Sequence, residues 1–277
     1  MTVLDVRRIL SGICLAMLGT GAGAASLPRP QHVVVVIEEN RSLKTMEAAS
    51  DLPYIHQLAR EGALLRNYYA ITHPSEPNYV ALFSGDTQGV TDDSCPHSYQ
   101  KPNLAEALAA KRMSFAIYSE NLPAVGFTGC GSEDKLYRRK HNPAPDFTAV
   151  PRDDNRPFSG FPADFSKLPA VAFVVPNMMD DMHDGTPAQA DAWLRTEMDG
   201  YKRWALKNHS LLILTWDEDD GVDGNRVMTV ILGQDVKPGN YDQQLNHYDL
   251  LRMLTDLYGA APVGAAAQAK GIDGVWK

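Results

Sequence analysis

The stretch Ala70–Gly89 reads AITHPSEPNYVALFSGDTQG and contains the junction around which the fold is organised. The residues that lead into it, Leu64–Ile71, are typical of a β-strand, and Thr72–Pro74 are typical of a turn. Apolar side chains then recur at helical spacing, which predicts a short helix. Ser75 is therefore expected where a strand turns into a helix.

This position gives Ser75 two interpretations. Serine is a preferred N-cap residue, so its hydroxyl could simply bind the first backbone N–H groups of the helix. Those same N–H groups and the positive end of the helix dipole also favour an anionic ligand. Pro77 fits either interpretation, because a proline in the first turn removes no helical hydrogen bond.

The rest of the chain alternates between strand and helix patterns. Further strands are predicted at His32–Glu38, Ser114–Tyr118, Ala170–Val175, Ser210–Thr215 and Val227–Leu232. Helices are predicted at Leu52–Glu61, Asn103–Lys111, Thr186–Ala205 and His247–Tyr258. Such alternation predicts a single α/β domain whose mainly parallel central sheet is flanked by helices on both faces.

The segment Ser119–Lys167 has little periodicity and is rich in Gly, Pro, Asp and Asn. A connection this long inside a compact domain is usually functional or disordered. It contains Cys130 and the basic run Arg138–Lys140, the one place where the chain concentrates positive charge. That run is either a solvated surface or part of a binding site.

The N-terminus is typical of an export signal. Arg7 and Arg8 precede an apolar run, and Ala22–Ala24 offers the small residues of a cleavage site. Residues 1–24 are therefore predicted to be a signal peptide, and residues 25–277 the catalytic domain of a soluble protein that is secreted or periplasmic. The apolar run is too short for a retained membrane span, so no stable membrane insertion is expected.

Export leaves two cysteines in an oxidising compartment. Cys95 and Cys130 are consequently expected to form one disulfide. The formal net charge of −8 does not attract polyanions, so a nucleic acid is not an expected partner. The sequence does not predict an oligomeric state.

Polar side chains follow four of the predicted elements. They are Glu39 and Asn40, Ser75, Asp180 with His183, and Asp217 with Glu218. The carboxyl ends of parallel strands share one edge of a sheet, where ligands bind. Oxygen ligands suit Mg²⁺, Ca²⁺ or Mn²⁺, and a histidine adds tolerance for transition metals such as Zn²⁺. One divalent metal ion beside a nucleophilic hydroxyl is therefore predicted.

These motifs also resemble those of the phosphoesterase family, from Val33 to about Gly259. The resemblance lies in Val36–Ser42, Thr72–Tyr79, Arg139–Pro143, Val175–Asn177 with Asp180–Asp184, Trp216–Asp220 and Asn246–Tyr248. The family contains secreted acid phosphatases and bacterial phospholipases C, and it belongs to the alkaline-phosphatase-like superfamily. The resemblance thus implies an alkaline-phosphatase-like fold.

The resemblance also implies a role for each matching residue. Ser75 is the implied nucleophile that takes the phosphoryl group. Glu39, Asn40, Asp217 and Glu218 are implied ligands or near neighbours of the metal. His141 and His183 are implied to hold phosphate oxygens and to protonate the leaving group. His73, Asp180 and His247 are either supporting neighbours or purely structural.

The leading hypothesis is a secreted, metal-dependent acid phosphatase that hydrolyses a small phosphate monoester. A histidine acid is most protonated below about pH 6.5, which fits activity at acid pH. A phospholipase C or other phosphodiesterase of the same family is the first alternative. A non-catalytic periplasmic protein that binds an anion or a metal is an alternative of another class.

Overall fold

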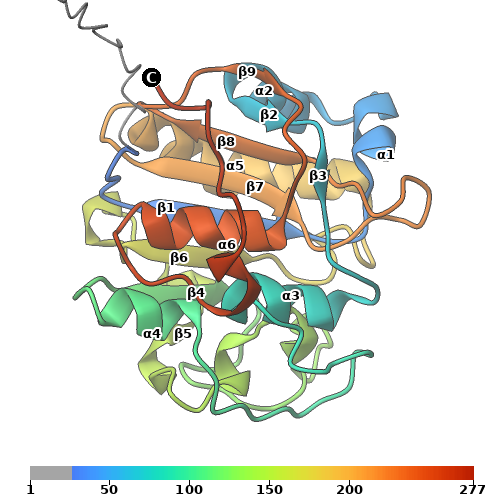
Figure 1. Cartoon of the computed structure of the whole chain (residues 1–277). Helices are drawn as coiled ribbons and strands as arrows, with labels where there is room; N and C mark the ends of the chain where they lie inside the picture. The colour runs from blue at the N-terminus through green and yellow to red at the C-terminus, as the bar shows by residue number, and fades with distance from the viewer. Residues whose placement is uncertain (1–26) are drawn as a thin grey trace, which may run out of the picture.

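The computed structural model describes residues 27–277, and its centre is an eight-stranded sheet with the strand order β5-β4-β6-β1-β7-β8-β2-β9 (Figure 1). The strands are β1 (Val33–Glu38), β2 (Ala63–Leu65), β4 (Phe115–Ser119), β5 (Asn155–Pro157), β6 (Val171–Val175), β7 (Leu211–Trp216), β8 (Thr229–Gly233) and β9 (Gly239–Tyr241). The short strands β3 (Tyr68–Tyr69) and β10 (Leu245–Asn246) pair separately.

The sheet is mostly parallel, as predicted. Strand β1 pairs in parallel with β6 on one side and with β7 on the other. Strand β8 is the exception, because it runs antiparallel to both β7 and β2. All six residues of β1 are buried, as expected of a central strand that is covered on both faces.

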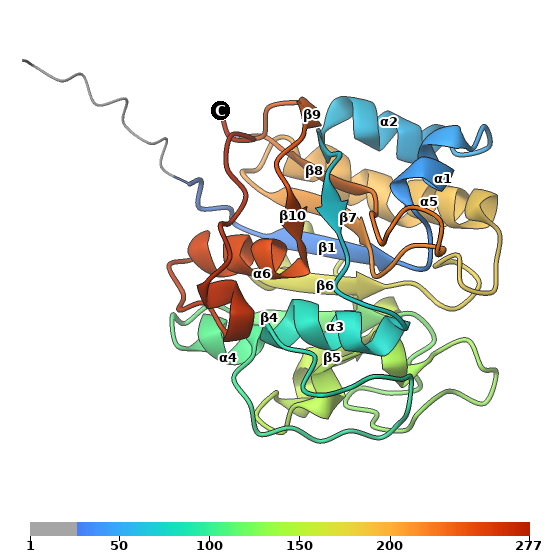
Figure 2. The ribbon, with the colours of Figure 1, turned by 45° about the vertical axis from the view of Figure 1, so that its right-hand side comes forward.

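Helices cover both faces of the sheet (Figure 2). One face carries α2 (Pro53–Glu61) and α5 (Pro187–Ala205), and the other carries α3 (Ser75–Ser84), α4 (Leu104–Ala109) and α6 (His247–Asp256). The short helix α1 (Leu43–Ala48) follows β1. The predicted single α/β domain is confirmed.

Local capping explains where several helices begin. Thr186 accepts a hydrogen bond from the backbone N–H of Gln189 at the start of α5. Asn246 and Asp249 form a reciprocal capping box at the start of α6. Both helix starts agree with the sequence pattern.

The prediction of one continuous strand over Leu64–Ile71 is wrong. It is divided into β2 and β3, which belong to different sheets. Strand β5 lies in the segment predicted to be irregular, and α1 was not predicted. The C-terminal tail, whose sequence is uninformative, packs Ile272, Val275 and Trp276 into the core.

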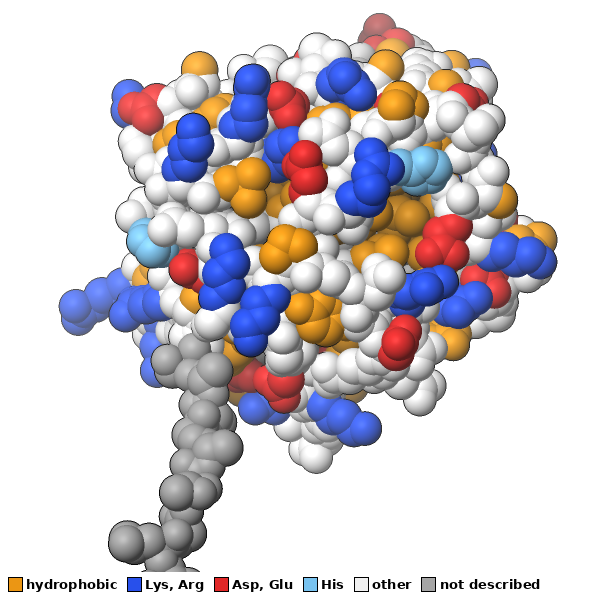
Figure 3. Space-filling view, turned by 90° about the horizontal axis from the view of Figure 1, so that it is seen from above, with side chains coloured by type: hydrophobic (Ala, Val, Ile, Leu, Met, Phe, Trp, Pro, Cys, Tyr) orange, Lys and Arg blue, Asp and Glu red, His pale blue; other side chains and the backbone are white. Residues whose placement is uncertain are grey.

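The predicted signal peptide lies outside the described residues. Within residues 27–277, no helix combines the length and apolarity needed to cross a membrane. On the face seen from above, Lys and Arg side chains are interspersed with Asp and Glu (Figure 3).

Candidate active site

Backbone hydrogen bonds bring the ends of three strands together. The Glu39 N–H donates to the Asp181 carbonyl at 2.8 Å, which joins the residues that follow β1 and β6. The Asp217 N–H donates to the Glu38 carbonyl at 3.0 Å, which adds the end of β7. The carboxyl edge of the sheet thus gathers the acids that the sequence placed there.

Ser75 is the first residue of α3 and faces this edge. The N-cap residue is Pro74, so the Ser75 hydroxyl does not cap the helix. It donates instead towards Glu39 Oε2 at 3.0 Å and Glu218 Oε1 at 3.3 Å. The side chain is only 2% exposed, so these carboxylates hold the hydroxyl in a defined position.

Glu39 lies at the centre of the cluster. Its Oε1 accepts a 2.5 Å hydrogen bond from the Tyr79 hydroxyl, and its Oε2 accepts from Asn40 Nδ2 at 3.1 Å. Burial, followed by the negative charges of Asp217 and Asp181, raises the pKa of Glu39 well above its usual range. A positive charge at this place would stabilise the ionised carboxylate.

Burial likewise disfavours the charged forms of Asp217 and Glu218 and raises their pKa values. Burial and the Glu218 charge raise the pKa of Asp217 to about 8, and burial raises the pKa of Glu218 to about 7. The Asn40 N–H donates to Asp217 Oδ1 at 3.1 Å. Asp217 Oδ2 is buried and has no hydrogen-bond partner among residues 27–277.

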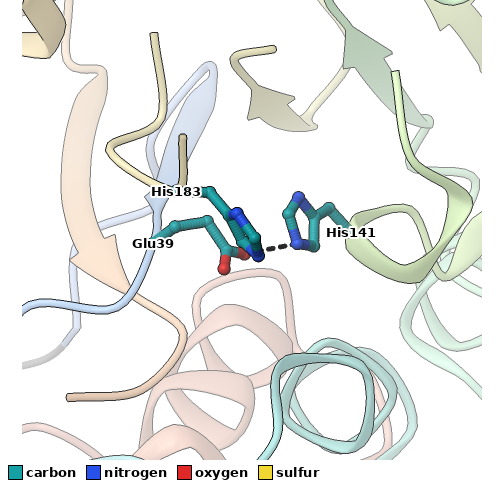
Figure 4. A group of neighbouring side chains, drawn as sticks. All are labelled: Glu39, His141 and His183. Atoms are coloured by element: carbon teal, nitrogen blue, oxygen red, sulfur yellow. Dashed lines mark ion pairs between the residues drawn. The ribbon is translucent and has the colours of Figure 1, made fainter. Parts of the chain in front are cut away.

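Two histidines complete a group with Glu39 (Figure 4). One potential ligand atom from each of Glu39, His141 and His183 lies within 4.8 Å of the other two. His141 is buried between acids, with Nε2 at 3.1 Å from Glu39 Oε1 and Nδ1 at 3.3 Å from Asp181 Oδ2. Burial and the Lys140 charge lower the pKa of His141 well below its usual value, so its ring stays neutral.

His183 is more exposed and lies beside a cation. Its Nδ1 is 2.8 Å from Asp184 Oδ1, and its Nε2 is 3.1 Å from Lys140 Nζ. Lys140 is paired in turn with Asp93, whose Oδ2 is 2.9 Å away. Asp93 Oδ1 accepts from the Glu76 N–H at 3.0 Å, so Asp93 connects Lys140 to the first turn of α3.

The sequence left the roles of His73, Asp180 and His247 open between supporting neighbours and purely structural residues. The three have different surroundings in the structure. His73 Nδ1 is 2.7 Å from Glu218 Oε2, which puts His73 next to the site. His247 is buried, and its Nε2 is 2.7 Å from the Asp217 carbonyl oxygen, so it supports the end of β7. Asp180 accepts instead from Asn177 and Gln189, and the neighbouring Asp181 contacts His141.

The donor set fits a divalent cation. Glu39, Asp217 and Glu218 are three buried carboxylates around one hydroxyl, and two of their oxygens, Asp217 Oδ2 and Glu218 Oε2, have no hydrogen-bond partner in the described part of the chain. Burying several negative charges together is costly unless a cation compensates them. Carboxylate and amide oxygens suit hard cations, while the nearby imidazoles suit transition metals.

The predicted disulfide is confirmed. Cys95 and Cys130 are bonded, and their Cα atoms are 5.8 Å apart. The Arg139 N–H donates to the Cys130 carbonyl at 3.1 Å. The disulfide therefore joins the loop that carries Asp93 to the segment that carries Lys140.

Sequence reasoning missed three contributors to the site, Tyr79, Asp93 and Asp181, and it left the basic run that contains Lys140 open between a solvated surface and a binding site. Tyr79 was named only as part of the motif Thr72–Tyr79. Asp181 could have been suspected from its position within the motif Asp180–Asp184. Asp93 gives no local signal, because it acts through a lysine far along the chain.

Comparisons with known proteins identify the family of this chain. The sequence profile of the phosphoesterase family matches residues 45–261. A phosphatidylinositol-3-phosphatase of Mycobacterium tuberculosis is 44% identical over 259 residues, which cover 92% of this chain and 86% of that protein. An acid phosphatase of Aspergillus fumigatus is 32% identical over 226 residues, covering 75% of this chain, and the chain spans about half (51%) of that protein.

A solved structure supports the fold. A protein in the alkaline phosphatase superfamily from Vibrio parahaemolyticus superposes with a TM-score of 0.60 at 14% identity, covering 85% of this chain and 69% of that one. The fold is thus that of the alkaline phosphatase superfamily, with a mostly parallel central sheet between layers of helices. The chain belongs to the phosphoesterase family and is a phosphoric ester hydrolase.

Proposed function

We propose that this chain is a secreted, metal-dependent acid phosphatase that hydrolyses phosphate monoesters through a phosphoserine on Ser75. The observation that carries the proposal is the position of the Ser75 hydroxyl. It lies at the N-terminus of α3, within hydrogen-bond distance of Glu39 and Glu218. A nucleophile at a helix N-terminus meets a phosphoryl group where backbone N–H groups and the helix dipole stabilise its oxygens.

A divalent cation held by Glu39, Asn40, Asp217 and Glu218 would neutralise the phosphoryl oxygens and lower the pKa of the Ser75 hydroxyl. Glu39 and Glu218 orient that hydroxyl and accept its hydrogen bond. Lys140 supplies a fixed positive charge on the side of His183. Phosphoryl transfer depends mainly on such positioning and charge neutralisation.

Proton delivery falls to His183 rather than to His141. His141 is buried, and the depressed pKa keeps it neutral. The His183 side chain is 26% exposed and its Nδ1 lies 2.8 Å from Asp184 Oδ1, which holds the ring in a position to donate a proton to the leaving oxygen. After ester cleavage the same histidine can take a proton from the water that hydrolyses the phosphoserine.

Ser75→Ala tests the nucleophile. We expect kcat for a soluble aryl phosphate to fall by roughly 10⁴-fold or more, because the covalent step is lost. Binding of inorganic phosphate should be retained, since the divalent cation, the Lys140 ammonium and the N-terminus of α3 remain. Ser166→Ala, in an exposed 3₁₀ turn, is the matched control and should behave as the unchanged protein. Retained turnover in Ser75→Ala would overturn the proposal.

Two further assays delimit the proposal. Hydrolysis of phosphatidylcholine without any hydrolysis of a soluble monoester would favour the phospholipase C alternative. Export is tested by determining the N-terminus of the protein recovered outside the cytoplasm. A chain that begins at Ala25 is expected, and an intact Met1 would contradict secretion through the predicted signal peptide.

A further inference from the structure

The three residues of the basic run Arg138–Lys140 have different surroundings. Arg139 is buried and satisfied: its Nε donates to Asp146 Oδ1 at 2.8 Å and its Nη2 to the His97 carbonyl at 2.9 Å. Lys140 is engaged by Asp93 and His183. Arg138 is half-buried, yet its guanidinium makes no hydrogen bond or ion pair with any residue in 27–277.

Arg138 lines a pocket that adjoins the active site. The pocket has a volume of about 270 Å³ and is lined by Asp93, Cys95, Cys130, Arg138 and Lys140. Lys140 belongs both to this pocket and to the active site, because its ammonium is 3.1 Å from His183 Nε2. A group bound in the pocket would therefore lie next to His183, the proposed proton donor to the leaving oxygen.

The pocket has an excess of positive charge in an otherwise acidic protein. Its one carboxylate, Asp93, already pairs with Lys140 and accepts from the Glu76 N–H. The Arg138 guanidinium is left uncompensated by any carboxylate of the described residues. A partly buried guanidinium without an acid partner is a ready binding group for a carboxylate or phosphate, which it can contact with two parallel N–H groups.

We propose that Arg138 and Lys140 form a subsite that selects phosphate esters whose leaving group carries a second negative charge. This inference rests on the function proposed above, and it adds the class of substrate. The phosphoryl group would occupy the Ser75 side and the leaving group would extend past Lys140 into the pocket. A carboxylate of a small metabolite and the phosphodiester of a lipid headgroup both supply such a second charge, and both are recognised by the same guanidinium chemistry.

Two soluble esters of similar size test the selectivity. The protein should hydrolyse 3-phosphoglycerate, which carries a carboxylate, with a higher kcat/KM than glycerol 3-phosphate. In Arg138→Gln we expect the ratio of the two kcat/KM values to fall by roughly tenfold to a hundredfold. This is the fold-change expected from the loss of one charge-assisted hydrogen bond. Arg203→Gln removes the same charge from an exposed place on α5 and should leave the ratio unchanged.

Ligand binding tests the subsite without turnover. In the Ser75→Ala protein, 3-phosphonopropionate should bind more tightly than propylphosphonate, and adding Arg138→Gln should remove most of the difference. If turnover fails on every ester while this preference persists, the proposed function is wrong and the subsite stands. If both phosphonates bind equally in the Ser75→Ala protein, the subsite is wrong whatever the enzyme hydrolyses.

A third substrate distinguishes the source of the second charge. Phosphatidylinositol 3-phosphate in phosphatidylcholine vesicles places a phosphodiester on the same ring as the monoester. A larger loss in Arg138→Gln on the lipid than on 3-phosphoglycerate assigns the subsite to a headgroup, and the reverse assigns it to a metabolite. An equal loss on all substrates, including glycerol 3-phosphate, would overturn selection by charge.

Discussion

Glu38 and Glu39 are neighbours at the end of β1, and both are completely buried. Burial is the largest cause of a raised pKa for each of them. Glu39 nevertheless accepts hydrogen bonds from the hydroxyls of Ser75 and Tyr79. Neither carboxylate oxygen of Glu38 has a hydrogen-bond partner within residues 27–277. Equal burial of two adjacent acids therefore does not imply equal function.

The difference lies in what surrounds each side chain. Glu39 lies next to α3 and its serine. The charges near Glu38 are those of Asp181, Asp180 and Glu120, and Glu120 accepts a hydrogen bond from Trp193 of α5. The Ser75 hydroxyl, the two histidines and Lys140 gather around Glu39, so the proposed function assigns the chemistry to the face of the sheet that carries α3.

The largest expected difference between the two acids appears when each is changed to its amide and the two losses are compared. Glu39→Gln should lower kcat/KM by roughly 10²–10³-fold or more, because it removes a charge that orients Ser75 and holds the cation. Glu38→Gln should change kcat/KM only a few-fold. Steady-state kinetics on one aryl phosphate measure both. A similar loss in both variants would contradict the assignment of function to one face.

Removal of the metal should have the next largest effect. We expect a chelator to reduce turnover by roughly a hundredfold or more and to lower the melting temperature, since a bound cation stabilises the native state. Added divalent ions should restore both. In Asp217→Asn the chelator should shift the melting temperature less. Full activity in protein shown by elemental analysis to be free of metal would contradict metal dependence.

The disulfide lies outside the group of residues around Glu39. It stabilises this region because it joins the loop of Asp93 to the segment of Lys140. Replacing both cysteines, as Cys95→Ser with Cys130→Ser, should lower the free energy of unfolding by roughly 4 kcal/mol, the chain-entropy value for a closed loop of this length. Urea unfolding of the variant and the unchanged protein measures the difference. No loss of stability would show that the two loops are held together by other contacts.

Glu76, the residue after Ser75, should give the smallest effect. Burial, followed by the Asp146 charge, raises the pKa of Glu76 from 4.5 to about 8. A raised pKa means that the native state holds the proton longer than the unfolded chain. The stabilisation is complete below about pH 4.5 and is lost as the pH rises through about 8.

Glu76→Gln should therefore flatten the decline in unfolding free energy between pH 5 and pH 8. Urea titrations of both proteins across this range, with Glu106→Gln on α4 as the control, measure the slope. Identical slopes for Glu76→Gln and the unchanged protein would contradict the raised pKa.

Much of the fold could be predicted because the deciding signals are local. Continuous apolar runs predicted β1, β6 and β7, and the predicted helix starts at Thr186 and His247 agree with the caps that Thr186 and Asn246 form in the structure. The division between β2 and β3 could not be predicted, because it depends on which strand each piece pairs with. The antiparallel direction of β8 depends likewise on tertiary contacts.

The site was predictable wherever a functional group follows a strand directly, as Glu39 and Asp217 do. The choice between Asp180 and Asp181 was not, because only the turn after β6 decides which of two adjacent carboxylates faces His141. Asp93 was missed, and Lys140 was left open between a solvated surface and a binding site, because a disulfide and a long irregular segment bring the two together.

The central claim is that Ser75 accepts the phosphoryl group, and trapping the intermediate tests it most directly. The enzyme would be mixed with an aryl phosphate, quenched in acid during the first turnover, digested and examined by mass spectrometry. We expect one phosphoryl group on the peptide that contains Ser75, and none in Ser75→Ala. Phosphate release with an unmodified Ser75 peptide throughout the turnover, or a phosphoryl group on another residue, would contradict the account.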